Sequence, residues 1–226
     1  MTGVVVNRCN FEQATWYGSF WTAKYLIKYL TDKGIPFIDL YKDWATKQNF
    51  NYYIKDARNN MVSGVGHGNE KQYTGQNYDV LLDADNQSDL NLMKGKVISA
   101  LSCEFGASAN RWLNAGAECF HGYKVTYYFI VYSEQQDDPY GLLFGGAHYI
   151  FDIMSIENNG DYKKAHNETY EAYTQASQQT NDTATKRYLV WDRDGMVTVY
   201  QTAKPEPQKT CILCKKVRKI LKCPIT

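Results

Sequence analysis

MVSGVGHG (residues 61–68) and KVISALSC (residues 96–103) decide the fold, because each is an apolar run that ends at a reactive side chain. Short runs rich in β-branched and aliphatic residues predict buried strands of a parallel sheet. The first run ends at His67-Gly68 and the second ends at Cys103, 36 positions after the histidine. Ligands of open α/β sheets bind beyond the carboxyl ends of the strands, so we expect His67 and Cys103 to meet in one crevice.

Cysteine and histidine at neighbouring strand ends are the residue types that nucleophilic catalysis uses. The thiolate is the attacking species, and an imidazole moves protons near neutral pH. Gly66 and Gly68 flank His67, and Gly106 follows Cys103, so the backbone can turn tightly and let a substrate approach. The simpler interpretation is that Cys103 is an inert core residue, since cysteine is among the most buried types. The nearby His-Gly block favours the reactive interpretation, whereas Cys119 has no such block and is expected to be core.

Strand and helix patterns alternate along the rest of the chain. We expect strands at residues 3–6, 37–40, 117–123 and 126–132, helices at residues 15–33, 107–115, 139–153 and 161–178, and a hairpin of residues 188–191 and 196–200 around Asp194-Gly195. Between the two deciding runs, the polar connection at residues 69–95 is long enough to carry short elements of its own. The alternation predicts an α/β fold with a mostly parallel sheet, helices on both faces and a C-terminal antiparallel hairpin.

Charge divides the chain into two parts. Residues 1–203 carry 18 Lys and Arg against 23 Asp and Glu, a net charge of −5, and residues 204–226 carry seven against one, a net charge of +6. We therefore expect one acidic globular domain, residues 1–203, followed by a basic, cysteine-containing tail, residues 204–226. The 19 tyrosines and 5 tryptophans exclude the aromatic-poor composition of a disordered chain.

The sequence predicts a reducing, cytoplasmic setting. No stretch approaches the roughly 20 apolar residues of a membrane helix, and MTGVVVNRCN lacks the basic and long apolar regions of a secretory signal. The six cysteines are scattered, unlike a disulfide framework, at Cys9, Cys103, Cys119, Cys211, Cys214 and Cys223. The three tail cysteines are one short of a structural zinc set, so we expect no metal. The tail is either a solvated, flexible segment, a substrate for self-processing, or a basic segment that contacts a membrane or nucleic acid.

NNMVSGVGHGNE and GKVISALSCEFG resemble the histidine and cysteine blocks of the caspase-like (clan CD) cysteine peptidases, the superfamily of caspases, legumains, gingipains and clostripain. In that superfamily an apolar strand ends in His-Gly, and a later one ends in a small residue followed by the nucleophilic Cys. The spacing and the block GAECFHGY are most similar to gingipain-like and legumain-like members, and the opening VVVN with a helix ending at KGIP is similar to legumains. The resemblance covers residues 3–153 and, more weakly, RYLVWDRDGMVTVY.

The resemblance implies a caspase-haemoglobinase-like fold and hydrolysis of a protein or peptide substrate through an acyl-enzyme on Cys103. It implies that His67 is the general acid and base, and that the backbone N–H groups of Gly68 and Cys103 form an oxyanion hole. Asn7 stands where legumains have an asparagine that orients the histidine. No cofactor is implied, although calcium is needed by some relatives.

Leu101 marks a departure from part of the superfamily. Legumains and clostripain-like enzymes have an acidic residue two positions before the Cys, whereas gingipain-like members have an apolar residue there. A basic P1 side chain requires a buried carboxylate, and an acidic one requires Arg. The substrate-binding candidates are Arg8, Glu104, Glu134 and Asp137, with Glu12 and Asp138 as further charged residues near predicted strand ends. By analogy with gingipains we expect a basic P1 residue. Because Leu101 replaces the acidic residue before the cysteine, a non-catalytic adaptor remains an alternative.

Overall fold

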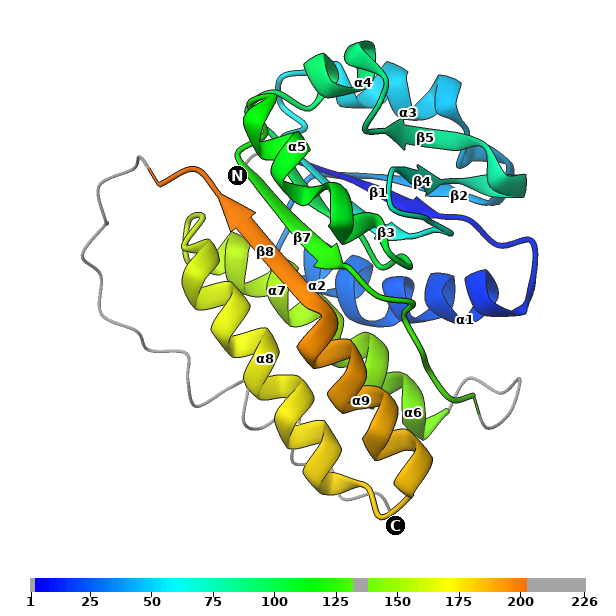
Figure 1. The fold of residues 1–226 in the computed structure, drawn as a ribbon. Helices are drawn as coiled ribbons and strands as arrows, with labels where there is room; N and C mark the ends of the chain where they lie inside the picture. The colour runs from blue at the N-terminus through cyan, green and yellow to red at the C-terminus, as the bar shows by residue number, and fades with distance from the viewer. Residues whose placement is uncertain (1–2, 132–137, 203–226) are drawn as a thin grey trace.

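A six-stranded sheet forms the centre of the computed structural model, which describes residues 3–131 and 138–202 (Figure 1). Its strands are Val4–Arg8 (β1), Phe37–Tyr41 (β2), Met61–Val65 (β3), Val97–Ser99 (β6), Cys119–Tyr123 (β7) and Met196–Tyr200 (β8). They lie in the order β2-β1-β3-β6-β7-β8, with the first five parallel and β8 antiparallel to β7. The predicted α/β class with a mostly parallel sheet is confirmed.

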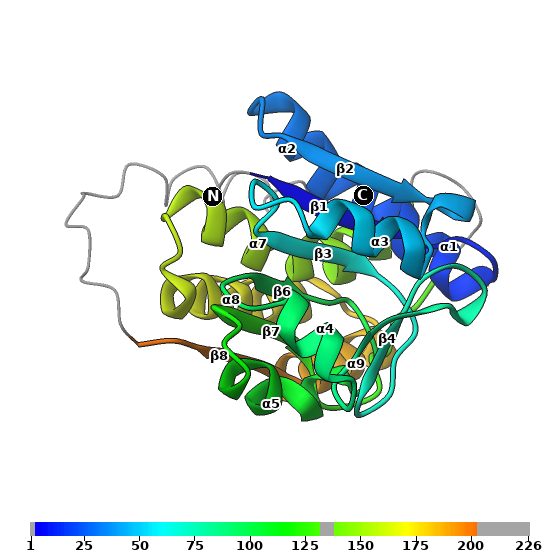
Figure 2. The ribbon, with the colours of Figure 1, turned by 90° about the horizontal axis from the view of Figure 1, so that it is seen from above.

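Helices cover both faces of the sheet (Figure 2). One side carries Gln13–Trp21 (α1), Lys28–Asp32 (α2), Ala147–Glu157 (α7), Tyr162–Gln179 (α8) and Thr183–Gly195 (α9), and the other carries Lys47–Ile54 (α3), Gln87–Leu92 (α4) and Ala109–Asn114 (α5). Val4 and Val6 belong to the apolar cluster on the first side, and Val5 belongs to the cluster on the second. Successive strand residues point to opposite faces, so the β-branched opening run is buried on both.

The first helix begins directly after β1 and ends where the sequence predicts. Helix α1, the wider π-helical turn Thr22–Ile27 (η1) and α2 form one continuous helix. Gly34 follows with φ +63°, a left-handed conformation that favours glycine, and the Ile35 N–H closes the end on the Leu30 carbonyl oxygen at 2.9 Å. The sheet then resumes at β2.

The long polar connection carries short elements, as predicted. They are an antiparallel pair, Gln72–Thr74 (β4) with Val80–Asp83 (β5), the turn Gln76–Tyr78 (η3) and helix α4. Other short helical turns are Lys42–Trp44 (η2), Phe105–Ser108 (η4), Pro139–Gly141 (α6) and Leu142–Gly146 (η5). No helix in the described part of the chain combines the length and apolar character that crossing a bilayer takes.

The predicted C-terminal hairpin is wrong in its first strand. Residues 188–191 lie inside α9, and β8 pairs with β7 instead. Helix α9 starts at the Asp182 cap and buries Thr185, Leu189 and Asp192, a helical spacing that packs against α8. Packing therefore overrides the β-propensity of Tyr-Leu-Val-Trp. Gly195 makes no hairpin turn; a Cβ there would lie 2.1 Å from Val125 Cγ2.

The predicted strand at residues 126–132 is also absent. Residues 126–131 belong to no strand, and residue 132 lies outside the described residues. The carbonyl oxygen of Thr126 accepts from Trp191 Nε1 at 2.9 Å, and the Tyr128 N–H donates to Asp192 Oδ1 at 3.0 Å. Side chains of α9 thus take the place of a neighbouring strand as hydrogen-bond partners.

Buried polar side chains lie between the sheet and α7. Asp152 is fully buried, accepts from the Ser63 hydroxyl, and has its pKa raised by burial to about 7. Burial also lowers the pKa of His148, to about 3, and that of His121 well below its usual value. His121 Nδ1 lies 2.8 Å from Thr198 Oγ1, so this imidazole is a core residue on β7 and does not enter the crevice.

We expect Asp152→Asn to stabilise the fold relative to wild type as pH rises. The folded wild-type protein holds a proton on Asp152 that an unfolded aspartate releases near pH 3.8. The stability of the wild-type fold that comes from this proton is present at low pH and is lost as the pH rises to about 7. Between pH 5 and pH 8 the difference in unfolding free energy between Asp152→Asn and wild type should shift by roughly 3 kcal/mol in favour of the variant. Urea denaturation at both pH values measures it.

Asp182→Asn is the matched control for that experiment. Asp182 is an exposed helix cap whose pKa is lowered by hydrogen bonds from Thr185, and asparagine caps helices comparably. Its effect should stay the same between pH 5 and pH 8. If Asp152→Asn, like Asp182→Asn, shows the same effect at both pH values, Asp152 is ionised in the folded protein.

Candidate functional site

The ends of β3 and β6 lie side by side. Val65, the last residue of β3, forms a parallel bridge with Leu101. The Gly66 N–H donates to the Leu101 carbonyl oxygen at 3.2 Å. His67 and Cys103 each follow that bridged pair by two positions, so both stand at the same edge of the sheet.

Gly68 is packed against the segment that carries Cys103. A Cβ atom at position 68 would lie 2.0 Å from Ser102 Oγ and 2.7 Å from the Cys103 carbonyl oxygen. Glycine is required here because the two loops approach so closely. The Thr74 N–H donates to the His67 carbonyl oxygen at 2.9 Å and supports the loop from the other side. The backbones of the two predicted oxyanion-hole residues, Gly68 and Cys103, are therefore adjacent.

Cys103 carries a free, half-buried thiol. Burial raises its pKa, and the nearby charges of Glu104 and Asp192 act in the same direction, while a hydrogen bond from the Tyr127 backbone N–H opposes them. The thiol is therefore protonated at rest, and attack requires a base to remove its proton.

The turn after Cys103 is strained. Glu104 has φ +58°, a left-handed conformation that costs a non-glycine residue about 1 kcal/mol or more. The Phe105 N–H closes the turn on the Cys103 carbonyl oxygen at 2.7 Å. Glu104 Oε1 accepts from Thr126 Oγ1 at 3.0 Å, which ties the turn to residues 126–131. Strain of this kind persists where surrounding structure holds a functional geometry.

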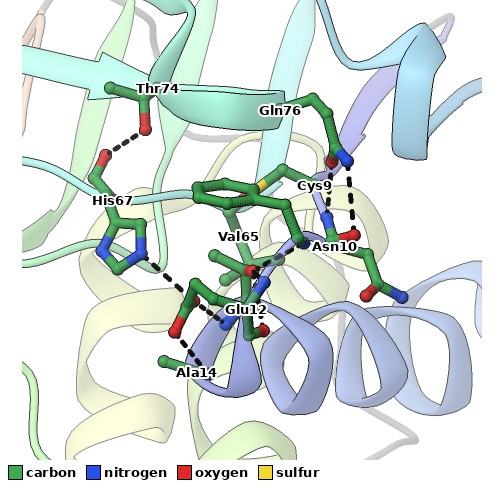
Figure 3. A network of polar contacts seen from close by, with 10 residues as sticks. Cys9, Asn10, Glu12, Ala14, Val65, His67, Thr74 and Gln76 are labelled. Atoms are coloured by element: carbon green, nitrogen blue, oxygen red, sulfur yellow. Dashed lines mark hydrogen bonds and ion pairs between the residues drawn. The ribbon is translucent and has the colours of Figure 1, made fainter.

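The imidazole of His67 is held by a carboxylate and two rings. Its Nε2 lies 3.1 Å from Glu12 Oε1, and each of the two side chains is 34% exposed (Figure 3). Tyr78 stacks on the imidazole with ring centroids 5.1 Å apart, and Phe11 meets it edge-on at 5.8 Å. The histidine is thus fixed in place and still reaches solvent.

Glu12 occupies the N-cap of α1. Its carboxylate accepts from the Thr15 N–H at 2.6 Å and from the Ala14 N–H at 2.9 Å. Burial alone would raise the pKa of Glu12, but these backbone hydrogen bonds and the charge of His67 lower it. The carboxylate is ionised at neutral pH and lies within hydrogen-bond distance of His67 Nε2. The sequence interpretation considered Glu12 only as a pocket residue, although the Glu-x-x-Thr spacing before a helix is a visible capping signal.

Asn7 supports the loop before His67. Its Nδ2 atom donates to the carbonyl oxygens of Val65 at 2.8 Å and Thr74 at 3.0 Å, and to the Tyr73 hydroxyl at 3.0 Å. The amide is fully buried within β1. Asn7 therefore fixes the backbone on both sides of the histidine, whereas the contact to the imidazole comes from Glu12.

The substrate-binding candidates are dispersed. Glu104 lies next to Cys103, but Arg8 pairs with Asp39 at 2.5 Å and lies over the Tyr41 ring at 4.1 Å, toward the β2 edge of the sheet. Glu134 and Asp137 lie outside the described residues. The further candidate Asp138 is a buried cap that accepts from the Tyr140 N–H at 2.9 Å.

Asp192 is a charged residue that the sequence interpretation missed. Its side chain is buried, burial raises its pKa well above the usual value, and in its ionised form it would raise the pKa of Cys103. Oδ1 accepts from the Tyr128 N–H, and Oδ2 has no hydrogen-bond partner among residues 3–131 and 138–202. The strand-like composition of residues 188–191 and the Asp194-Gly195 turn signal hide this residue, and the helical spacing of Thr185, Leu189 and Asp192 is the signal that reveals it.

Among the residues that the structure describes, no group of three or more His, Cys, Asp and Glu side chains is arranged to hold a metal ion. Cys9 donates its thiol to the Val65 carbonyl oxygen at 3.3 Å (Figure 3), and Cys119 is buried in β7, so both are core residues. Cys103 differs from them in being partly exposed at a strand end.

Comparison with known proteins adds no relative: no family model matches the chain, and no curated protein is similar to it in sequence.

Proposed function

We propose that this chain is a cysteine endopeptidase of the caspase-like superfamily, with Cys103 as nucleophile and His67 as general acid and base. The observation that carries the proposal is the pairing of strand ends: the Val65 to Leu101 bridge and the Gly68 contact place a His-Gly loop against a partly exposed free cysteine. The parallel sheet with helices on both faces and an antiparallel last strand supports a caspase-haemoglobinase-like fold.

In this proposal, His67 removes the thiol proton and the sulfur attacks the carbonyl carbon of the scissile bond. Because burial raises the pKa of Cys103, the proton transfer accompanies attack. The ionised Glu12 stabilises the imidazolium that forms, and the imidazolium then gives its proton to the leaving amine. Water hydrolyses the thioester, with His67 again as base.

The oxyanion of the tetrahedral intermediate would lie between the two loops. The Gly68 backbone packs against the Cys103 carbonyl oxygen, and the proposal assigns the N–H groups of both residues as the donors. The strained Glu104 turn and the Thr74 hydrogen bond to His67 keep both loops in place before substrate arrives. Such preorganisation is where the largest catalytic stabilisation usually arises.

Two carboxyl groups are the candidates for recognising the P1 side chain. Glu104 and Asp192 are the residues whose charge acts on the Cys103 thiol, and Asp192 holds an unpaired buried oxygen within the described part of the chain. A guanidinium or ammonium group would satisfy either carboxylate. A basic P1 residue is therefore the specificity that the proposal favours.

A library of internally quenched peptides varied at P1 tests the function. We expect cleavage of peptides with P1 Arg or Lys, and a loss of at least about tenfold in kcat/KM with Asp192→Asn if its unpaired oxygen binds the cation. Glu104→Gln is the matched variant, and the larger loss identifies the P1 carboxylate. Wild-type protein that cleaves no peptide in the library would favour the non-catalytic adaptor.

A further inference from the structure

Tyr78 forms an exposed aromatic surface beside the proposed general acid. Its ring stacks on His67 at 5.1 Å, with an interplanar angle of 29°, and Phe11 contacts both, at 4.8 Å from Tyr78 and 5.8 Å from His67. Tyr78 is 59% exposed, which is high for a large ring in a three-ring cluster. One face of the cluster therefore remains available to a further apolar group.

The backbone that presents Tyr78 is strained. Asn77 and Tyr78 are consecutive non-glycine residues with φ of +51° and +62°. Each such residue costs about 1 kcal/mol or more, and the cost is retained where other contacts enforce the conformation. An exposed aromatic ring at a strained position gains little from burial, so fold stability does not explain it.

The loop around Tyr78 is tied down on two sides. The Gln76 N–H donates to the Ala45 carbonyl oxygen at 2.7 Å, and the Gln76 side chain accepts from the Asn10 N–H at 2.8 Å (Figure 3). A Cβ at Gly75 would lie 2.0 Å from the Ala45 carbonyl oxygen, so this approach leaves no space for a side chain. These contacts hold the Tyr78 ring in position before any ligand is present.

We propose that Tyr78 and Phe11 form the subsite for the P1′ side chain, the residue that carries the leaving amine, and that they select an aromatic or large aliphatic residue. The inference rests on the proposed function. His67 must come within hydrogen-bond reach of the P1′ nitrogen to protonate it, so the P1′ side chain lies close to the imidazole. Tyr78 is the exposed ring stacked there, and aromatic pairs form at centroid distances of 4.5–7 Å.

Trp44 is another exposed ring on a neighbouring turn. It is 58% exposed and lies in η2, which packs against η3, the turn that contains Tyr78. A second exposed ring thus lies on a turn that packs against the turn of Tyr78. The strongest selection is expected at P1′, because the Tyr78 ring is in direct contact with His67, the proposed general acid.

The test uses full-length protein and internally quenched peptides that share one P1 residue and differ at P1′, with Phe, Leu, Ala and Asp. Wild type should cleave the P1′ Phe peptide about tenfold better than the P1′ Ala peptide in kcat/KM, as expected for one good apolar contact. Tyr78→Ala should reduce that ratio to about two or less, and Tyr78→Phe, which keeps the ring, should retain it. Tyr52→Ala is the matched control, since Tyr52 is an exposed tyrosine on α3, and it should leave the ratio unchanged.

The outcomes separate the two proposals. If wild type cleaves the peptides without preference at P1′, or if Tyr78→Ala lowers all four rates equally, the P1′ subsite is wrong while the peptidase remains. If wild type cleaves none of them and none of the P1 library, both are wrong. Thermal melting of each variant shows that a changed ratio does not come from unfolding.

Discussion

Cys103→Ala is expected to lower peptide hydrolysis at least about 10³-fold, because no other described group can replace the nucleophile. The same variant should lose the thiol that a peptidyl alkylating agent with a basic P1 residue labels fastest. Steady-state kinetics on the best library peptide measures the first effect, and mass-spectrometric peptide mapping measures the second. The fold should persist, since Cys103 is only half-buried and alanine makes no new contact.

Cys9→Ala and Cys119→Ala are the matched controls. Burial raises the pKa of Cys9 to about 12 and that of Cys119 well above its usual value, so neither thiol is expected to react. Both variants should keep the wild-type kcat, although each leaves a core cavity that costs some stability. Mapping the label by residue separates Cys103 from the tail cysteines, which lie outside the described residues. A Cys103→Ala protein that hydrolyses peptides at the wild-type rate would overturn the assignment.

His67→Ala is expected to lower kcat by about 10²- to 10⁴-fold, the range typical of general acid and base catalysis. The raised pKa of Cys103 makes the effect large, since the proposal assigns removal of the thiol proton to His67. The peptidyl alkylating agent should also label Cys103 more slowly in the His67→Ala variant than in wild type. A buffer of small imidazoles should restore part of the rate to the alanine variant, which a merely destabilised protein would not show.

Glu12→Gln isolates the carboxylate that contacts His67. Glutamine keeps one carbonyl oxygen that can accept the Thr15 N–H and so part of the cap on α1, but its amide nitrogen cannot accept from Ala14 and it carries no charge. We expect a smaller loss of kcat than with His67→Ala. The ratio of wild-type to variant activity should fall as pH decreases through the lowered pKa of Glu12, because the wild-type carboxylate then loses its charge. Thr15→Val, which weakens the cap and keeps the carboxylate, should change stability more than rate.

The strands of the parallel part of the sheet follow closely from the sequence. Runs such as Val4–Arg8 and Met61–Val65 are short, β-branched and bounded by polar residues, so local pattern and burial agree. The end of the helix after β1 is also predictable, because Gly34 adopts the left-handed conformation that ends it. Where local propensity and tertiary packing point the same way, the prediction holds.

The failures occur where packing reverses local propensity. Residues 188–191 have strand-forming side chains, but their helix buries Leu189 against the core while β8 takes the edge beside β7. That error also hid Asp192, whose place near Cys103 depends on the helical path. Residues 126–131 have a strand-like composition, yet α9 side chains supply their hydrogen bonds.

The placement of His67 and Cys103 at one edge of the sheet was predictable from the sequence, and the residues that contact His67 were less so. His67 and Cys103 follow apolar runs, a pattern that one-dimensional sequence shows directly. Glu12 and Tyr78 reach the imidazole from two separate loops, and only the folded arrangement of β1, β3 and η3 brings them together. Contacts between loops depend on geometry that no periodicity encodes.

Acid-quenched turnover of an activated ester that carries the preferred P1 residue tests the central claim most directly. Acid stops deacylation and preserves a thioester, so peptide mapping locates the acyl group. The account predicts one acyl mass on the peptide that contains Cys103, absent from Cys103→Ala. An acyl group on another residue, or hydrolysis with no acyl group trapped on Cys103, would contradict it.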